Sequence, residues 1–410
     1  MGQTVNTPVE FDPMSSTYFN DPYDVYRQLR DVAPVYWNDS YGFYALSRFD
    51  DVSRAHRDLP ALSSTYHVEF LTLMSRQLIP ENSRSLIMMD PPQHDRMRAL
   101  VSRVFTPRAI SKLEDSVRDI IGDLLDGLAG AAKFDFVADF TALFPIEVIS
   151  TMLGVPPADR QEVRQTSDAA LHREEGQTEL SKENADAFAK NFMYFVGLAQ
   201  ERRARPADDM ITGLTEVSVE RPDGSTSMLT DEEIGKFAVL LGAAGAETVT
   251  KLVGNAAVLF AEHRDAWRTL RADPSQIPNA IEEVLRFQPP SQYQGRFAIE
   301  DTEYHGVTIK AGTPVLLLTG AATRDERRFE NPDVFDITRK SSMTLAFGYG
   351  IHVCLGASLA RLESRIALEQ VARRFPDFEI DDSGLRRVQM SNVAGYSNVP
   401  FIGQPLAAKS

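Results

Sequence analysis

The sequence predicts a mainly α-helical protein with one small β region. Hydrophobic residues recur at helical spacing over most of the chain, whereas the alternation typical of strands is confined to short stretches. No internal repeat and no Gly/Ser-rich linker interrupts the 410 residues. We therefore expect a single domain over residues 1–410, with residues 1–15 forming a flexible N-terminal arm.

Helix signals are strongest in five segments. They are Pro22–Val32, Pro107–Leu128, Asn184–Arg203, Thr230–His263 and the stretch from Pro278 to Pro289. Glu233 stands three residues after Thr230, which is the capping-box pattern of a helix start because each side chain satisfies a free backbone N–H. Pro278 suits a first helical turn, and the pair Pro289-Pro290 ends the same helix.

Strand signals occur in Val35–Leu46, in Tyr304–Leu318 and in the tail Phe378–Phe401. In the second segment, the turn 310–313 contains Gly312 and separates two apolar pairs, which predicts a hairpin. These segments are distant in the sequence, and we expect them to assemble into the small β region.

The composition indicates a folded protein with room for a large core, since 43% of the residues are hydrophobic and 25% are charged. The net charge of −15 argues against non-specific binding to nucleic acid or to anionic lipid. Basic side chains nevertheless gather in one stretch, where only Asp95 and Glu114 oppose them. They are His94, Arg96, Arg98, Arg103, Arg108 and Lys112. By composition alone, the simplest interpretation of this stretch is a solvated helix face.

No feature of the sequence indicates secretion or a membrane span. The N-terminus lacks the basic and apolar regions of a signal peptide, and the longest apolar run, Phe237–Ala246, is shorter than the ~20 residues of a span. The single cysteine, Cys354, excludes an intramolecular disulfide, a cysteine-rich zinc site and an iron–sulfur cluster. We expect a cytoplasmic protein.

That cysteine lies in a glycine-rich loop, Phe347–Gly356, which is followed by hydrophobic residues at helical spacing. Cys354 is therefore expected near a helix N-terminus, where the helix dipole and free N–H groups favour a thiolate. Three interpretations remain open from these residues alone. Cys354 is a nucleophile with His352 as its base, a metal ligand, or an inert buried thiol.

Two other patterns are ambiguous when taken alone. Glu283 and Arg286 stand three residues apart on one helix, which usually means a solvated surface pair. The pair Glu247-Thr248 follows two glycines inside the longest predicted helix, and the simplest interpretation is a packing seam of small residues.

The pattern Phe347-x-x-Gly350-x-His352-x-Cys354-x-Gly356 resembles the haem-thiolate loop of the cytochrome P-450 family at each defining position, with His352 where arginine is commoner. The resemblance extends over nearly the whole chain. It implies the cytochrome P-450 fold, in which haem b is held between a long central helix and the cysteine loop. Cys354 is then the axial ligand of the iron, where a thiolate pushes electron density onto the metal and favours O–O cleavage.

The same resemblance assigns roles to the other patterns. Glu283 and Arg286 form a structural triad with a downstream arginine, Arg339. Thr248 hydrogen-bonds the reacting oxygen in an oxygen-activating groove, and Glu247 takes part in proton delivery. The residues implied in haem binding are His94, Arg98, Ala244, Arg296, Phe347, Gly348, His352, Cys354 and Gly356. The basic members of this set, His94, Arg98, Arg296 and His352, are expected to pair with the haem propionates.

The implied activity is that of a soluble monooxygenase, which inserts one oxygen atom of dioxygen into a lipophilic small molecule. We expect no fused reductase, so electrons come from a separate ferredoxin or similar redox protein that docks on the basic stretch together with Arg361 and Arg365. We expect a monomer with no nucleic-acid or membrane partner. The residues expected to line the substrate pocket are Phe70, Leu71, Met74, Ile87, Leu240, Ala244, Ser291, Gln292, Tyr293, Gln294 and Tyr396.

Other functions remain open at this stage. A peroxide-driven haem peroxygenase would need no ferredoxin, and a non-catalytic haem sensor or carrier would not need the Glu247-Thr248 pair. A non-haem cysteine enzyme is a remote third alternative. The sequence does not decide among steroids, terpenoids, fatty acids and polyketides, because a largely apolar pocket suits any of them.

Overall fold

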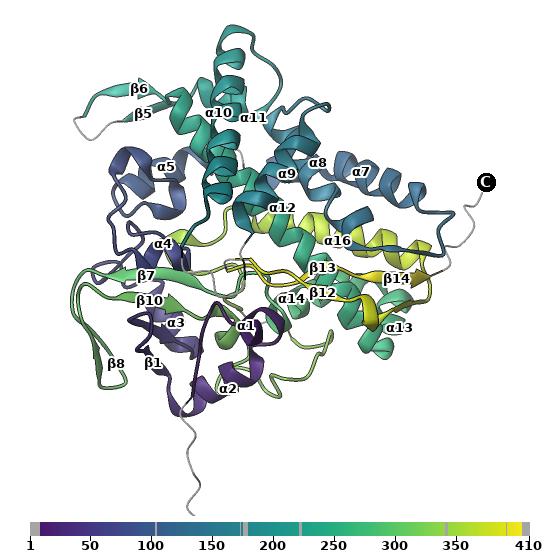
Figure 1. The fold of residues 1–410 in the computed structure, drawn as a ribbon. Helices are drawn as coiled ribbons and strands as arrows, with labels where there is room; N and C mark the ends of the chain where they lie inside the picture. Colours follow the sequence, from purple (N-terminus) through teal and green to yellow (C-terminus); the bar gives the residue numbers. More distant parts are fainter. Residues whose placement is uncertain are drawn as a thin grey trace, which may run out of the picture.

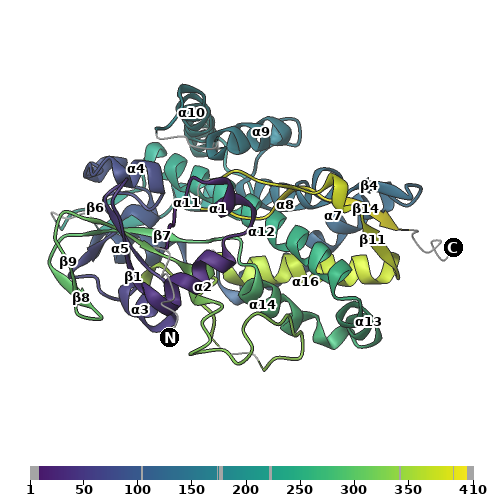
Figure 2. The same ribbon diagram turned by 60° about the horizontal axis from the view of Figure 1, so that its bottom comes forward.

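The structure is a computed structural model that describes residues 9–102, 105–172, 174, 179–220, 224–340, 343–390 and 392–403. The fold is mainly helical, and the largest sheet lies at one end of the molecule (Figures 1 and 2). The predicted fold class is confirmed.

The α-helices are α1 (Ser16–Asn20), α2 (Tyr23–Val32), α3 (Phe49–Ala55), α4 (Phe70–Met74), α5 (Gln93–Val101), α6 (Pro107–Ser111), α7 (Glu114–Gly127), α8 (Phe144–Leu153), α9 (Arg160–Leu171), α10 (Lys182–Ala204), α11 (Met210–Thr215), α12 (Asp231–Glu262), α13 (Arg264–Ala272), α14 (Ile277–Phe287), α15 (Thr319–Ala322) and α16 (Ala357–Arg374). The shorter turns are η1 (Glu81–Ser83), η2 (Leu86–Met88), η3 (Val137–Thr141, a π-helical turn), η4 (Pro274–Gln276), η5 (Gly350–His352) and η6 (Asp382–Gly384). The strands are β1 (Val35–Asn38), β2 (Phe43–Leu46), β3 (Leu62–Ser63), β4 (Lys133–Asp135), β5 (Ser218–Glu220), β6 (Thr226–Met228), β7 (Gln294–Ala298), β8 (Thr302–Tyr304), β9 (Val307–Ile309), β10 (Pro314–Leu317), β11 (Phe378–Ile380), β12 (Arg386–Arg387), β13 (Tyr396–Asn398) and β14 (Pro400–Gly403).

The longest helix, α12, passes through the core and contacts α8, α9, α10, α14 and α16 (Figure 2). Its predicted capping box is confirmed, because Glu233 N–H donates to Thr230 Oγ1 at 3.1 Å and Thr230 N–H donates to Glu233 Oε2 at 2.8 Å. By length and composition α12 could cross a membrane, but 71% of its most apolar window is buried inside the protein. That burial identifies α12 as a core helix of this fold.

The largest sheet has the strand order β1-β2-β10-β7-β3. The predicted hairpin in Tyr304–Leu318 is wrong, because β9 pairs with β8 whereas β10 runs parallel to β2 and antiparallel to β7. The physical reason is burial: all four residues of β10 are buried, whereas β9 is exposed at Val307 and Thr308. A strand buried on both faces belongs inside a sheet rather than at an exposed hairpin. The C-terminal tail forms the sheet β11-β14-β4 and the pair β12-β13.

Two further boundaries differ from the sequence prediction. The segment Pro107–Leu128 is two helices, because Leu113 N–H closes a tight turn on Ile110 O at 3.0 Å between α6 and α7. The expected arm is not separate over its described part, since Phe11 and Met14 are buried in a hydrophobic cluster with the aromatic residues of α1, α2 and β2. Residues 1–8 of the arm lie outside the described residues.

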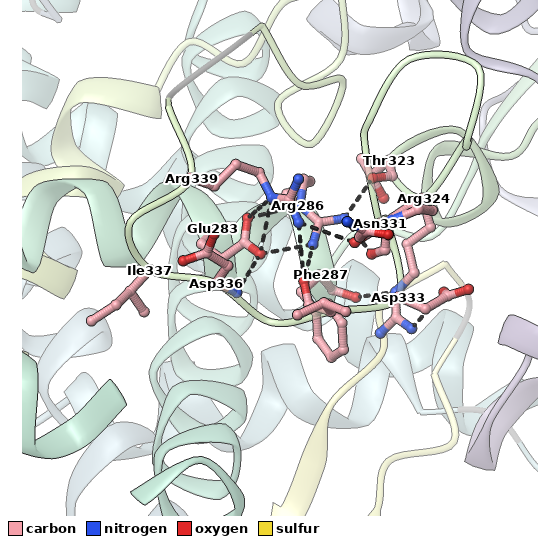
Figure 3. Close-up of polar contacts among 12 residues, drawn as sticks. Glu283, Arg286, Phe287, Thr323, Arg324, Asn331, Asp333, Asp336, Ile337 and Arg339 are labelled. Atoms are coloured by element: carbon pink, nitrogen blue, oxygen red, sulfur yellow. Dashed lines mark hydrogen bonds and ion pairs between the residues drawn. The ribbon is translucent and has the colours of Figure 1, made fainter. Parts of the chain in front are cut away.

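A buried polar cluster joins α14 to the chain that leads to the cysteine loop (Figure 3). Arg286 donates from Nε and Nη2 to the two carboxylate oxygens of Glu283, both at 2.8 Å. Arg339 Nε lies 3.2 Å from Glu283 Oε2, and Asp336 N–H donates to Oε1 at 2.9 Å. The Glu283 and Arg286 side chains are 2% and 1% exposed, so this is a buried triad and not the surface pair that spacing alone suggested.

Arg286 also fixes the backbone that crosses this cluster. Its guanidinium donates to the carbonyls of Pro332 at 2.7 Å, Val334 at 3.1 Å and Thr323 at 3.3 Å. The structure thus brings Glu283, Arg286 and Arg339 into contact, and their hydrogen bonds hold the backbone of residues 323–339 ahead of the cysteine loop.

We predict that Glu283→Gln lowers the free energy of unfolding by about 3–5 kcal/mol, because it leaves Arg286 buried without its counter-ion. Glu282→Gln is the matched control, since Glu282 is the preceding residue and forms a more exposed pair with Arg361. That change should cost less than about 1 kcal/mol. Urea unfolding of both variants measures the difference, and equal losses would contradict a special role for the triad.

Candidate functional site

The cysteine loop is held in a defined backbone conformation before α16. Cys354 N–H donates to Phe347 O at 2.8 Å, and Gly348 N–H donates to Leu345 O at 2.8 Å. Gly350 has a φ of +71°, and a Cβ there would lie 2.8 Å from His56 O, so glycine is required both for the backbone conformation and for the close approach. Gly356 is the N-cap of α16, and Cys354 precedes it by two residues.

The Cys354 thiol lies between opposing electrostatic influences. Burial raises its pKa, whereas a hydrogen bond from the Gly356 N–H and the charges of Arg98 and Arg361 act in the opposite direction. The side chain nevertheless has exposed surface. A group that is both desolvated and exposed lies on the wall of an opening in the protein interior, and three donors or cations there favour the thiolate.

The middle of α12 also has side chains that are accessible to solvent, although most of this helix is buried. Ala244 is exposed and Thr248 is half-buried, whereas Glu247 is 6% exposed. Thr248 Oγ1 donates to Ala244 O at 2.8 Å, one turn back along the helix. Because α12 packs directly against α16, the helix that follows Cys354, these exposed surfaces belong to adjacent elements. A small side chain, a hydroxyl and an acid thus meet at one place on α12.

Cationic and imidazole side chains from α5, from β7 and from the cysteine loop itself lie close together. The rings of His94 (α5) and His352 (η5) are 4.4 Å apart, and His352 Nε2 lies 3.2 Å from Ser64 Oγ. Arg98 Nη2 donates to Val353 O at 2.7 Å. Arg296 (β7) is 2% exposed, and its Nη1 donates to Gly295 O at 2.7 Å.

Burial strongly shifts the pKa values of several of these groups. It lowers the pKa of Arg296 to about 10, with Asp90 acting in the opposite direction. Burial, followed by the charge of Arg296, lowers the pKa of His352 to about 2 and that of His56 to about 3. Two imidazoles are therefore kept neutral beside a buried guanidinium.

Several buried nitrogens of this cluster lack a partner within the described part of the chain. His94 Nδ1 lies 3.0 Å from Asp95 Oδ1, but its Nε2 has none. Neither ring nitrogen of His56 makes a hydrogen bond of normal geometry, although Gln294 lies nearby. Buried donors without acceptors are costly, so this cluster fits an anionic ligand. The two carboxylates of haem b, together with a thiolate for its iron, match this donor set.

His56 is the residue of this cluster that the sequence did not reveal. It is 2% exposed in the turn after α3 and touches the cysteine loop through its backbone at Gly350. No spacing pattern links residue 56 to residue 350, so only the fold brings them together.

The predicted pocket residues separate into two groups. Phe70, Leu71, Gln292, Tyr293 and Tyr396 are buried in closed packing, so they present almost no surface to a ligand and the packing does not agree with their predicted role. The aromatic ones complete hydrophobic clusters, which their spacing could not distinguish from a pocket wall. Pocket lining stays a prediction for the residues with accessible surface, which are the exposed Ala244 and the half-buried Met74, Ile87, Leu240, Ser291 and Gln294.

The basic stretch is more neutralised than its sequence indicated. Arg361 pairs with Glu282 at 2.6 Å, and Arg365 pairs with Glu114 at 2.8 Å. These four residues line a groove of about 570 Å³ between α6, α14 and α16. Arg103 lies outside the described residues.

Two cations of this stretch, Arg108 in α6 and Lys112 just after it, are exposed, and Ile110 and Ser111 between them line the same groove. Neither forms an ion pair within the described residues. Arg96, by contrast, lines a separate cavity of about 310 Å³ with η1, η2 and the start of α12.

Comparisons with known proteins agree with this fold and site. The family model described as Cytochrome P-450 matches residues 176–394. A protein of Mycobacterium tuberculosis (strain ATCC 25618 / H37Rv), "Putative cytochrome P-450 123", is 41% identical over 391 residues, which are 95% of this chain and 96% of that protein. Cytochrome P-450 CYP109Q5 from Chondromyces apiculatus superimposes with a TM-score of 0.86 at 32% identity, covering 98% of this chain and 100% of that one. CYP109E1 from Bacillus megaterium, solved in complex with corticosterone, gives a TM-score of 0.82 at 33% identity, covering 94% and 98% of the two chains.

Proposed function

Because the chain belongs to the cytochrome P-450 family, and is therefore a haem-b monooxygenase, we propose that it inserts one oxygen atom of dioxygen into a lipophilic small molecule, with electrons from a separate ferredoxin-type protein. The observation that carries the proposal is the combination of one loop-held thiol with a buried cluster of cations and imidazoles, in which ring nitrogens of His56 and His94 have no partner among the described residues. We further propose a cytoplasmic monomer.

Different site residues would hold different parts of the cofactor. Cys354 would ligate the iron, and His94, Arg98, Arg296 and His352 would hold the two propionates, with His56 as an added donor. When bound, haem with a thiolate ligand supplies the activation of dioxygen. The Gly356 N–H, which already hydrogen-bonds Cys354, favours the thiolate form of the sulfur.

Two residues of α12, Glu247 and Thr248, would deliver protons to the reacting oxygen. Thr248 Oγ1 donates to Ala244 O at 2.8 Å, and rotation of this hydroxyl would let it donate to a reacting oxygen instead. Glu247 is the adjacent acid and is almost fully buried, so a proton that it holds is sheltered from bulk water. An acid and a hydroxyl next to each other supply the two groups that a controlled proton transfer requires.

The substrate is proposed to be lipophilic, on two grounds. The half-buried residues Met74, Ile87 and Leu240 are apolar, with Ser291 and Gln294 as the polar contacts, and Gln294 Nε2 donates to Ser291 Oγ at 2.8 Å. An apolar lining with few polar groups suits a ligand that loses little solvation on entry. The similar CYP109E1 was solved with a steroid, which supports this class without selecting one compound.

The electron donor is proposed to dock beside the groove between α6 and α16. Arg108 and Lys112 are the exposed cations there, and the rest of the protein is strongly acidic. A local positive area on an acidic protein orients an acidic partner toward the cysteine loop.

We expect the dithionite-reduced protein to give a carbon monoxide complex with a strongly red-shifted Soret band, because Cys354 would ligate the haem iron as a thiolate. Cys354→Ala should abolish that band, whereas Val353→Ala, the adjacent change of an exposed side chain, should retain it. Absorption spectra of the three proteins provide the measurement. A normal band in Cys354→Ala, or no haem in the wild type, would refute the assignment.

For Thr248→Ala, we expect the dissociation constant of the substrate to change by less than about threefold, which is under 1 kcal/mol. The fraction of electrons recovered as product should fall severalfold and peroxide should rise, because the hydroxyl that guides the proton is missing. Thr250→Ala is the control, since Thr250 Oγ1 donates instead to Thr141 O. Coupling of Thr248→Ala at the wild-type level would contradict this role.

Charge reversal at Arg108 or Lys112 should slow reduction by a ferredoxin about tenfold at low salt and leave substrate binding unchanged. The difference from the wild type should disappear near 1 M salt, where the Debye length falls to about 3 Å. Lys310→Glu, on the exposed turn between β9 and β10, is the matched reversal elsewhere. Stopped-flow reduction kinetics test this docking face, and equal effects of all three reversals would exclude it.

A further inference from the structure

The cavity that Arg96 lines is distinct from the haem site and from the predicted substrate pocket. It has a volume of about 310 Å³ and lies between residues 81–97, strand β5 and the first turns of α12. Among the described residues, its lining includes none of the cysteine loop and none for which substrate-pocket lining stays a prediction. Glu81 and Asn82 line it and are exposed, so a ligand can enter directly from solvent. Its volume is at the lower end of small-molecule sites, which span about 300–1,000 Å³.

Much of the cavity lining is apolar. Leu86 and Met89 come from the segment around η2, and Met97 comes from α5. Val219 of β5 and Phe237 of α12 complete this surface, and α5 contacts both β5 and η2. Such a surface favours the apolar part of a ligand, because both lose contact with water when the ligand enters.

Three cationic side chains line the same cavity, and none of them forms an ion pair within the described part of the chain. They are Arg84, Arg96 and Lys236, and each is half-buried. Arg84 Nε donates to Ile79 O at 2.8 Å, and Lys236 Nζ donates to Asn82 O. Both acceptors are neutral carbonyl groups. The charges of these cations are therefore not matched by carboxylates of the described residues.

The two acids of the lining do not cancel these charges. The carboxylate of Glu233 accepts the Thr230 N–H at 2.8 Å in the capping box, and Glu81 is exposed to solvent. The lining thus keeps an excess of cations on a protein whose net charge is −15. Ser85, in the same lining, has a buried Oγ without a hydrogen-bond partner among the described residues, which is unfavourable for the protein alone. Apolar surface next to unmatched cations suits a small amphipathic anion.

We propose that this cavity is a second ligand site, which binds a small lipophilic carboxylate alongside the substrate. Arg96 of α5 and Lys236 of α12 would hold the carboxylate, because both are cations that line the cavity from different elements. The apolar lining would cover the hydrocarbon part. The bound molecule would join α5 to α12 and add to the hydrogen bond that Lys236 already makes to Asn82 O.

Occupation of the cavity would reach the substrate pocket through two shared walls. Leu86 of η2 lines the cavity, whereas the adjacent Ile87 is predicted to line the substrate pocket. On α12, Phe237 lines the cavity, and Leu240 one turn later is predicted to line the pocket. Because coupling between two sites is reciprocal, we expect each ligand to bind more tightly when the other is present. This coupling rests on the proposed function, whereas the carboxylate site does not.

The direct test is a calorimetric titration of the haem-loaded protein with octanoate, while the azole econazole occupies the haem pocket. Octanoate should bind as one molecule per chain. Octanol, which has the same chain without the charge, and inorganic phosphate, which has charge without the chain, should each bind at least about tenfold more weakly. If econazole prevents octanoate from binding, the carboxylate occupies the haem pocket and the proposal is wrong.

Variants of the lining locate the site. Arg96→Gln and Lys236→Gln should each weaken octanoate binding about tenfold, because a hydrogen bond to a charged group is lost. Arg96→Lys, which keeps the charge, should retain most of the affinity. Arg268→Gln is the matched control, since Arg268 is an exposed arginine of α13. The absorption spectrum of the econazole complex identifies the variants that are folded and loaded with haem, and equal octanoate affinities among these proteins would refute the site.

The coupling is measured by titrating econazole into the protein with and without saturating octanoate, followed by the Soret shift. The dissociation constant of econazole should fall severalfold in the wild type and should not respond to octanoate in Lys236→Gln. An econazole affinity that octanoate leaves unchanged in the wild type would disprove the coupling. If the wild type oxidises no substrate, the proposed function fails, whereas calorimetry still judges the carboxylate site independently.

Discussion

The interaction on which the rest of the structure depends is the buried carboxylate of Glu283. It accepts hydrogen bonds from Arg286, Arg339 and the Asp336 backbone, and Arg286 in turn holds three carbonyls of residues 323–334. A buried ion pair contributes little net stability, because the cost of desolvating its charges offsets their attraction. What it does contribute is geometry, because the two paired arginines hold carbonyls of residues 323–334 and so fix the backbone ahead of the cysteine loop.

The cation cluster beside the cysteine loop differs from this triad, because its buried groups are not all matched by partners. Arg296 is buried there as a charge, and ring nitrogens of His56 and His94 have no partner among the described residues, which is unfavourable for the protein alone. The neutral state of His352 and His56 limits this cost, since only the guanidinium groups remain charged. A dianionic ligand would satisfy these donors and would stabilise the folded state through its binding. Folding and cofactor capture are thus coupled through the same few side chains.

The sequence predicted the features that short spacings encode. The predictions that failed concern contacts between residues far apart in the chain. The capping box of Thr230 and the helix after Pro278 depend on short spacings, and the structure confirms them. Glu283 and Arg286 are also close in sequence, but their grouping with Arg339 was implied by the family resemblance and not by spacing. The pairing of β10 depends on which faces are buried, a property of the assembled sheet.

Other non-local features could not be found from spacing for the same reason. Arg361 is neutralised by Glu282, 79 residues earlier in the chain, and His56 meets the cysteine loop across almost 300 residues.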